Sequence, residues 1–294
     1  LSNWLQQNLS EYDAVIIHGL WLFHSHAVIR MIRQLRKAGS KRVPRVFVMP
    51  HGMLDPWFQR DRTRRLKAWR NWLYWKAIEQ RVIAEADGLL FTCQKELELA
   101  RETFRPYHPR REVNVGYGVA EPPAFTPAME TAFRNVCPET AERPYLLFLS
   151  RIHPKKGVDL LLRAYSQVAK ESDQQRPLPS LVIAGPTDSI YAREMQQLAG
   201  ELNLIRTAVD GDVQSRAAAY FPGMLTGDAK WGALYGCDAF MLPSHQENFG
   251  IAVVEALACG KPVLISDQVN IYDDIQRTAS AIVQSDTLTG CVKL

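Results

Sequence analysis

The sequence predicts an α/β protein with two parallel-sheet domains, and three observations carry this prediction. Short β-rich runs alternate with amphipathic stretches along most of the chain, which is typical of βαβ units. A proline-rich segment without apolar periodicity, residues 116–143, separates two such series. The chain has 294 residues, enough for two domains of ordinary size. We therefore expect one domain over 1–140 and a second over 141–294.

The individual elements follow from apolar runs and from the spacing of apolar residues between them. The expected strands are short and rich in branched and aromatic side chains, as buried strands of a parallel sheet are. They cover 14–18, 45–49, 88–92, 112–115, 145–149, 180–184, 239–242 and 262–266. Helices are expected near 25–38, 63–85, 94–104, 157–171, 189–203, 227–236 and 250–259.

Composition narrows the class of protein further. The chain is 47% apolar and 22% charged, values typical of a soluble globular protein, and it contains no apolar run of the length that crosses a membrane. The net charge is +4, but residues 1–140 carry +7 and the remainder −3, so the first half suits an anionic partner. No secretory signal is visible, and an odd number of cysteines without a C-x-x-C pair suits a reducing compartment. We therefore expect a cytoplasmic protein.

The most informative stretch places two carboxylates, Glu247 and Glu255, on either side of a glycine that opens an apolar helix. The loop before this helix follows the expected strand 239–242, and ligands bind at the carboxyl edge of an open parallel sheet. The helix start favours an anion such as a phosphate, and a carboxylate there is suited to the hydroxyls of a sugar or ribose. The alternative is that Glu247 caps the helix while Glu255 is solvated.

This stretch reads Pro-Ser-x-x-Glu-x-Phe-Gly, then Glu-Ala, then Gly-x-Pro-Val. It resembles the donor-site motif of the retaining glycosyltransferases with the GT-B fold, glycosyltransferase family 4, and its Glu-x7-Glu spacing matches that motif. The resemblance implies two Rossmann-like domains facing a cleft. It implies that Glu247 contacts the transferred sugar and that Glu255 binds the ribose of the donor. The donor-binding residues around the helix start would be Asn248, Phe249, Gly250 and Ile251.

A second group of charges follows the strand 145–149. Arg151, Lys155 and Lys156 lie in a loop before a helix, where cations would form a diphosphate site, although a basic loop in solvent is the alternative. The loop resembles the family pattern Ser/Gly-Arg-x4-Lys-Gly, which implies that Arg151 and Lys156 neutralise the two phosphates while Lys155 is solvated. By the same resemblance, Gly185 at the end of strand 180–184 would lie near the nucleotide.

Two further segments bear on the prediction of a donor site. Phe221-Pro222-Gly223-Met224-Leu225 resembles a later loop of the family that passes near the base. Asp210-Gly211-Asp212 formally fits D-x-D, a metal-binding motif of a different glycosyltransferase fold, but an irregular polar stretch of this kind favours a surface turn. We therefore expect no metal, and no cofactor besides the nucleotide sugar as co-substrate.

Two histidines end expected strands of the first half, and each is followed by glycine. They are His18 and His51, although a structural histidine bonded to backbone is a common alternative. In the resembled family a histidine of the acceptor domain lies in the active site at about the second position. This implies a catalytic role for His51 and leaves His18 as an acceptor-side candidate.

Residues 57–76 form a basic stretch rich in tryptophan, and two interpretations of it remain open. In the first interpretation, the stretch binds an anionic membrane surface, which would place the protein at the inner face of a membrane. Alternatively, its aromatic side chains pack inside the domain and its arginines are solvated. No motif of a nucleic-acid-binding module occurs, so we expect no nucleic-acid partner.

We thus expect a metal-independent retaining glycosyltransferase. It would move a sugar from a nucleotide-diphosphate sugar to a glycan, lipid or small-molecule acceptor, in polysaccharide or envelope assembly. Two alternatives stay open: another GT-B enzyme such as an epimerase or phosphorylase, and an inactive module that binds sugar nucleotides or a membrane surface. The family's N-terminal Gly-rich loop and final crossing helix have no counterpart, so we expect both domains to be incomplete.

Overall fold

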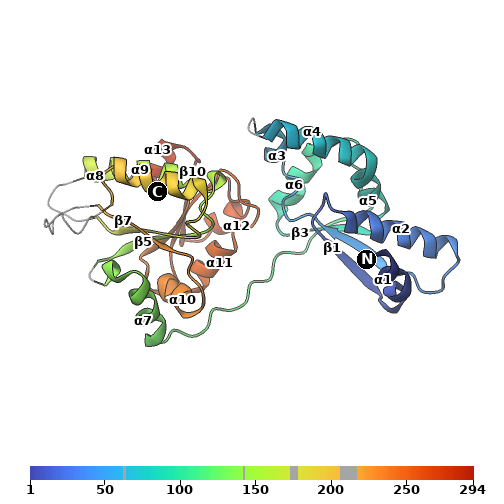
Figure 1. The fold of residues 1–294 in the computed structure, drawn as a ribbon, viewed down its shortest axis with the longest axis horizontal. Helices are drawn as coiled ribbons and strands as arrows, with labels where there is room; N and C mark the ends of the chain where they lie inside the picture. The colour runs from blue at the N-terminus through green and yellow to red at the C-terminus, as the bar shows by residue number, and fades with distance from the viewer. Residues whose placement is uncertain (62–63, 142, 173–177, 206–216) are drawn as a thin grey trace. The chain divides into compact units, whose positions relative to one another are not determined.

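The computed structural model describes residues 1–61, 64–141, 143–172, 178–205 and 217–294. The chain divides into two compact units, Leu1–Tyr117 and Gly118–Leu294. Each unit contains one parallel β-sheet with helices packed on it (Figure 1). The predicted α/β class with two parallel-sheet domains is therefore confirmed.

The first unit is built on a four-stranded parallel sheet in which each strand pairs with the next one along the chain. Every strand lies within one residue of its predicted position. The two central strands are buried because Val46, Val48, Leu89 and Phe91 pack into the core of this unit. The strands are β1 (Ala14–His18), β2 (Arg45–Met49), β3 (Gly88–Phe91) and β4 (Glu112–Asn114).

The helix predicted over 63–85 is interrupted in the structure. A π-helical turn, η3 (Trp75–Glu79), separates two α-helices. This turn brings Trp75 into the core, where it is fully buried and stacks on Phe104 with ring centroids 4.7 Å apart. Among the described residues of this unit, the helices are α1 (Ser2–Asn8), α2 (Phe23–Lys37), α3 (Trp57–Arg60), α4 (Arg65–Tyr74), α5 (Gln80–Glu85) and α6 (Gln94–Thr103), with a 3₁₀ turn, η1 (Leu9–Glu11).

The described residues of the second unit form a six-stranded parallel sheet in the order β10-β9-β8-β5-β6-β7. This is the 3-2-1-4-5-6 order of doubly wound sheets, in which the chain reverses direction between its first and fourth strands. The reversal here lies between β5 and β8. The strands are β5 (Tyr145–Leu149), β6 (Ser180–Ala184), β7 (Ala219–Gly223), β8 (Ala239–Leu242), β9 (Val263–Ser266) and β10 (Ala281–Gln284).

Two of these strands, β7 and β10, were not expected. The start of the segment predicted as a loop, Phe221–Leu225, is instead the end of β7, so that prediction is corrected. β7 lies at the edge of the sheet, where one side of the strand makes no ladder bonds and a proline such as Pro222 is tolerated.

The helices of the second unit cover both faces of its sheet (Figure 1). In that view α8, α9 and α13 lie on one side, and α7, α10 and α11 on the other. The helices are α7 (Pro127–Val136), α8 (Val158–Glu171), α9 (Ile190–Glu201), α10 (Gly227–Gly236), α11 (Ile251–Ala258), α12 (Tyr272–Gln276) and α13 (Leu288–Lys293). Two 3₁₀ turns are η4 (Pro138–Thr140) and η5 (Pro154–Lys156).

The boundary between the units differs from the predicted division after residue 140. Helix α7 lies within the stretch expected to be a linker, yet it packs on α10 of the second unit. Phe133 of α7 is buried and its ring centroid lies 5.3 Å from that of Tyr145 on β5. Pro127 opens α7 at a position where the missing N–H costs nothing, so a proline that suggested a linker in fact begins a helix.

Candidate active site

The reversal point of the second sheet positions two loops side by side. One loop follows β5 and leads through η5 to α8, and the other follows β8 and leads to α11. Because β5 and β8 are paired in parallel, both loops leave the sheet at its carboxyl edge. The predicted residues Arg151 and Lys156 lie on the first loop, and Glu247 to Gly250 lie on the second. The fold therefore brings the two predicted groups to the place where doubly wound sheets bind ligands.

Direct contacts hold these two loops together. The backbone N–H of His245 donates to the carbonyl of Lys155 at 2.8 Å, and Lys155 Nζ donates to Gln246 Oε1 at 3.1 Å. Gly157 has φ +67°, and a Cβ at this position would lie 2.0 Å from the carbonyl oxygen of Pro243. Only glycine fits this close approach. The expectation that Lys155 is solvated is wrong, because its ammonium binds the second loop.

An ion pair joins the two predicted groups. Lys156 is only 5% exposed, and its Nζ contacts Glu247 Oε2. Burial lowers the pKa of Lys156 to about 7, and the cations Lys155 and Arg151 add to the shift. The Glu247 carboxylate opposes that shift, because a contacting anion favours the charged ammonium. Arg151 itself is exposed on the same loop.

The backbone of Glu247 is fixed independently of its side chain. Its N–H donates to the carbonyl of Gln268 at 3.0 Å, and its carbonyl accepts from the N–H of Asn270 at 2.9 Å. Gly250, the N-cap of α11, has no side chain that could cap the helix, and Glu247 contacts Lys156 through Oε2.

The second predicted carboxylate, Glu255, also has a lysine partner. Lys230 Nζ on α10 donates to Glu255 Oε1 at 2.7 Å. The two side chains are 25% and 14% exposed, so Glu255 is not a solvated surface residue. Lys230 was missed by the sequence analysis, because the two residues lie on different helices and no local pattern joins them. Asn248, Phe249, Gly250 and Ile251 lie between the two carboxylates, at the start of α11.

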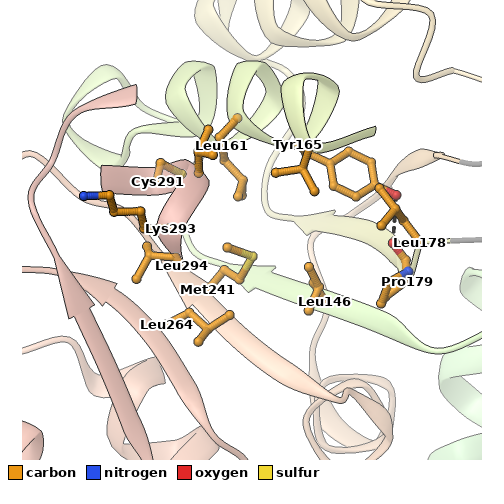
Figure 2. Close-up of a pocket in the computed structure, with 13 residues that line it drawn as sticks. Leu146, Leu161, Tyr165, Leu178, Pro179, Met241, Leu264, Cys291, Lys293 and Leu294 are labelled. Atoms are coloured by element: carbon orange, nitrogen blue, oxygen red, sulfur yellow. Dashed lines mark hydrogen bonds between the residues drawn. The ribbon is translucent and has the colours of Figure 1, made fainter. Parts of the chain in front are cut away.

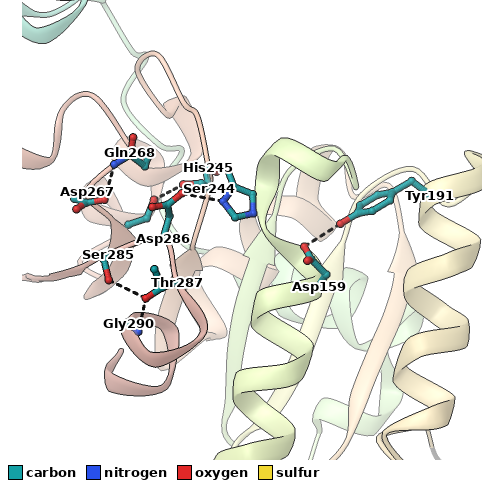
Figure 3. Close-up of polar contacts among 11 residues, drawn as sticks. Asp159, Tyr191, Ser244, His245, Asp267, Gln268, Ser285, Asp286, Thr287 and Gly290 are labelled. Carbon is teal, nitrogen blue, oxygen red and sulfur yellow. Dashed lines mark hydrogen bonds and ion pairs between the residues drawn. The ribbon is translucent and has the colours of Figure 1, made fainter. Parts of the chain in front are cut away.

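Further polar contacts anchor the second loop to neighbouring strand ends (Figure 3). His245 Nδ1 lies 2.9 Å from Asp286 Oδ2, just beyond β10. The Ser266 hydroxyl at the end of β9 donates to the carbonyl of Ser244 at 2.5 Å. Near the start of α8, the Tyr191 hydroxyl donates to Asp159 Oδ1 at 3.1 Å. None of these contacts was predicted, and the first two fix the loop that carries Glu247.

Gly185 lies at the same edge of the sheet, after β6. Its N–H donates to the carbonyl of Gly223 at 2.9 Å, and a Cβ on it would lie 2.1 Å from the carbonyl oxygen of Ser150. The ends of β5 and β6 thus approach too closely for any larger residue. This packing explains the glycine, and its predicted contact with a nucleotide stays a prediction.

In the first unit the two predicted histidines are direct neighbours. His18 Nδ1 lies 2.8 Å from His51 Nε2, and the rings stack with centroids 5.1 Å apart. Because β1 and β2 pair in parallel, their carboxyl ends place the two side chains together. Burial lowers the pKa of His51, and His18 adds to that shift.

A buried carboxylate that the sequence analysis missed supports the turn after His51. Glu96 Oε1 accepts from the N–H of Gly52 at 2.5 Å, and Oε2 accepts from the N–H and hydroxyl of Thr92. His51 itself has φ +52°, a conformation that needs such support in a residue other than glycine. A signal was available, because Glu96 is the third residue after the N-cap Cys93 of α6, a capping-box position.

The basic aromatic stretch 57–76 agrees in part with each of the two interpretations, because some of its aromatic side chains are buried and others are exposed. Trp75 packs in the core, whereas four apolar side chains of α4 are exposed, and Leu66 and Trp69 remain 87% and 63% accessible. Exposed basic residues accompany them on or next to this helix. We call this set the α4 surface; it consists of Leu66, Trp69, Trp72, Leu73, Arg65, Lys67, Arg70 and Lys76.

Three further features lie outside the two groups of site residues. Among the described residues, no helix is long and apolar enough to cross a membrane, and no group of three or more acidic, histidine or cysteine side chains could hold a metal. The D-x-D at 210–212 lies outside the described residues. A separate apolar cavity of about 330 Å³ lies between α8, α13 and the sheet, lined by residues such as Leu161, Met241 and Leu294 (Figure 2). No predicted site residue lines it.

The chain matches two models of protein families. The one described as Glycosyl transferases group 1 matches residues 129–285, and the one described as Glycosyl transferase 4-like domain matches residues 1–118. Among curated proteins, the chain is 33% identical over 194 residues to the D-inositol 3-phosphate glycosyltransferase of Geodermatophilus obscurus, covering 63% of this chain and 39% of that protein. A protein of the same name from Thermobispora bispora is 30% identical over 210 residues, covering 70% of this chain and 46% of that protein. The chain thus spans less than half the length of these relatives.

Solved structures resemble the chain in fold. HepE from Anabaena, in complex with UDP and glucose, matches with a TM-score of 0.69 at 16% identity, over 99% of this chain and 70% of that one. Sucrose-phosphate synthase from Thermosynechococcus elongatus matches with a TM-score of 0.60 at 19% identity, over 98% and 68%. This likeness confirms the predicted GT-B fold class.

Proposed function

The chain belongs to the family described as Glycosyl transferases group 1, and on this premise we propose that it transfers a sugar from a nucleotide-diphosphate sugar with retention of anomeric configuration. The observation that carries the proposal is the meeting of Lys156 and Glu247 at the reversal point of the second sheet. Lys156 supplies a cation suited to a diphosphate, Glu247 supplies a carboxylate suited to sugar hydroxyls, and the two are in contact. The presence of UDP-glucose in a HepE structure supports testing that donor first.

Each residue has a role in this proposal. Arg151, Lys156 and the N–H groups at the start of α11 stabilise the charge that develops on the leaving diphosphate, without a metal. An ammonium has three donors, so Lys156 can hold a phosphate oxygen while it keeps its contact with Glu247 Oε2. Glu247 Oε1 then accepts from a hydroxyl of the sugar. Glu255 accepts from the ribose, and Gly185 allows the nucleotide to approach the strand ends.

We assign the acceptor to the first unit, with His51 as the catalytic histidine and His18 beside it. The low pKa of His51 supports this assignment, because a neutral imidazole can accept a proton or hydrogen bond from an attacking hydroxyl near pH 7. The acceptor would be a glycan, lipid or small molecule in polysaccharide or envelope assembly. A covalent intermediate and a same-face attack both agree with retention.

Release of the sugar tests the proposal directly. The protein is incubated with UDP-, GDP- and ADP-glucose in the presence of a chelator, and proton NMR follows both nucleotide release and the anomer of the sugar first released. We expect release from one donor with its configuration kept. Glu247→Gln should abolish release, whereas Glu201→Gln, at an exposed carboxylate on α9, should not.

Other outcomes of this experiment separate the alternatives. Release of the opposite anomer would contradict retention. Binding of a donor without release by the unmodified chain would favour an inactive sugar-nucleotide module. Conversion of the nucleotide sugar into an isomer, with no free sugar, would instead identify an epimerase.

We also propose that the α4 surface contacts an anionic membrane, which places the protein in the cytoplasm at the inner face of a membrane. Exposed Leu66, Trp69 and Trp72 supply apolar side chains for the interface, and four basic residues accompany them. Each cation close to an anionic surface contributes about 1 kcal/mol, and this attraction falls off within a Debye length. Charge and apolar contact would therefore act together.

Sedimentation with vesicles tests this contact. We expect the protein to bind vesicles that contain phosphatidylglycerol and not vesicles of phosphatidylcholine alone. Replacing Leu66 and Trp69 by alanine should weaken binding, whereas Ile190→Ala, at a residue 70% exposed on α9, should leave it unchanged. Equal binding by the α4 variant and the Ile190 variant would contradict the proposal.

A further inference from the structure

Each glutamate of the Glu-x7-Glu motif is held by one lysine that comes from another part of the fold. Lys156 of the β5 loop holds Glu247, and Lys230 of α10 holds Glu255. Helices α10 and α11 lie on the same side of the second sheet (Figure 1). The first pair has a role in the proposed function, whereas no role has been given to Lys230.

The contact between Lys230 and Glu255 leaves part of the carboxylate available. Lys230 Nζ binds Oε1 at 2.7 Å, and an ionised carboxylate offers about four lone-pair positions over its two oxygens. Oε2 can therefore accept from the neighbouring hydroxyls of a ribose while Oε1 stays with the lysine. The ammonium also lies 4.5 Å from the ring centroid of Trp231, a second attraction that limits where it can move.

Charge gives a second reason for the lysine. Two unneutralised carboxylates would repel a diphosphate that binds at this site, because like charges in a partly buried site repel strongly. Lys156 neutralises one carboxylate and Lys230 the other. Without Lys230, Glu255 would repel the phosphates and would be free to turn toward solvent.

We propose that Lys230 is the positioning residue for Glu255 and thereby sets the preference of this site for ribonucleotides over 2′-deoxyribonucleotides. The proposal rests on the proposed function, in which Glu255 binds the ribose. A lysine that only joins two helices would contribute to folding, and its loss would affect ribose and deoxyribose ligands equally. Selectivity between the two sugars therefore separates a positioning role from a structural one.

Calorimetric titration with UDP and 2′-deoxy-UDP, and likewise with the GDP and ADP pairs, tests the proposal. Lys230→Met removes the charge and keeps most of the side-chain volume. We expect it to weaken binding of the ribonucleotide about tenfold, which corresponds to about 1.4 kcal/mol, and binding of the deoxynucleotide less than threefold. Lys230→Arg should keep most of the selectivity, because it keeps the cation. Lys170→Met, at an exposed lysine of α8, is the matched control and should change neither affinity.

The remaining outcomes overturn the proposal in distinguishable ways. Equal weakening of both ligands by Lys230→Met would show that Lys230 acts only through the charge near the phosphates and not by positioning Glu255 against the ribose. Unchanged affinities would show that the Lys230–Glu255 ion pair only joins the two helices and has no part in nucleotide binding. If the unmodified protein binds no nucleoside diphosphate, the proposed function fails and this inference fails with it. Thermal unfolding of each variant shows whether any loss of binding reflects loss of folding.

Discussion

The buried Lys156 predicts that binding of a nucleotide sugar takes up a proton. Burial lowers the pKa of Lys156 to about 7, so the share of the free protein that carries the ammonium falls as the pH rises from 6 to 8. A diphosphate beside the amine favours the charged form. Binding should therefore take up a fraction of a proton that is small at pH 6 and rises toward one at pH 8.

The affinity should follow the same titration. Raising the pH removes the proton that binding requires, so affinity falls as the pH rises above 7 and is nearly constant well below it. Between pH 6 and pH 8 the dissociation constant should rise by up to about tenfold, the factor that a pKa of about 7 gives. The Glu247 carboxylate limits this change, since it supports the ammonium in the free protein.

Calorimetry in buffers with different ionisation enthalpies measures the proton uptake at pH 8. A nucleotide sugar is the better ligand, because the terminal phosphate of a free nucleoside diphosphate titrates near pH 6 and would add its own protons. Lys156→Arg stays charged at every pH used and should bind without uptake. An unmodified protein that takes up no proton at pH 8, or an arginine variant that takes up as many, would refute the reasoning.

Two further predictions concern stability. Gly157→Ala places a Cβ against Pro243 in a left-handed conformation and should lower the free energy of unfolding by more than about 1 kcal/mol. In Gly200→Ala, on α9, the added Cβ meets no atom within 4 Å, so this variant should raise the free energy of unfolding by about 0.5 kcal/mol. Chemical denaturation compares the two variants. A loss no larger in Gly157→Ala than in Gly200→Ala would contradict the close approach of the two loops. Burial raises the pKa of the Glu79 carboxyl above that of an ordinary glutamate. The protonated carboxyl therefore contributes to stability at low pH, and this contribution is lost as the pH rises above the pKa of an ordinary glutamate. Glu79→Gln should therefore gain in melting temperature relative to the unmodified protein between pH 5 and pH 8, and a gain that shrinks with rising pH would contradict this.

Strands were predictable where a continuous run of apolar residues is largely buried. β5, β6 and β8 are of this kind, and their positions agree with the prediction. β7 was missed because Pro222 and Gly223 are common in loops, and β10 was missed because it is an edge strand that is partly exposed. Position in the sheet, which the local sequence does not reveal, makes these two segments strands.

The candidate site was predictable in part. The motif residues Glu247, Glu255, Arg151 and Lys156 lie within short patterns, so the sequence alone locates them. Their partners do not follow from spacing, because Lys230 and Glu255 are 25 residues apart on two helices that tertiary packing brings together. The contact between His18 and His51 was easier to predict from the sequence, because both residues lie at the carboxyl ends of adjacent parallel strands, which end side by side.

The most direct test of the account is the binding of donor nucleotides to the unmodified chain. UDP, GDP, ADP and their common sugar conjugates are titrated by calorimetry with a chelator present, beside Glu255→Ala. The account predicts that one nucleotide binds at a single site, that the chelator has no effect, and that Glu255→Ala weakens binding about tenfold or more. Absence of binding by every nucleotide, or equal binding by the variant, would contradict the proposed donor site.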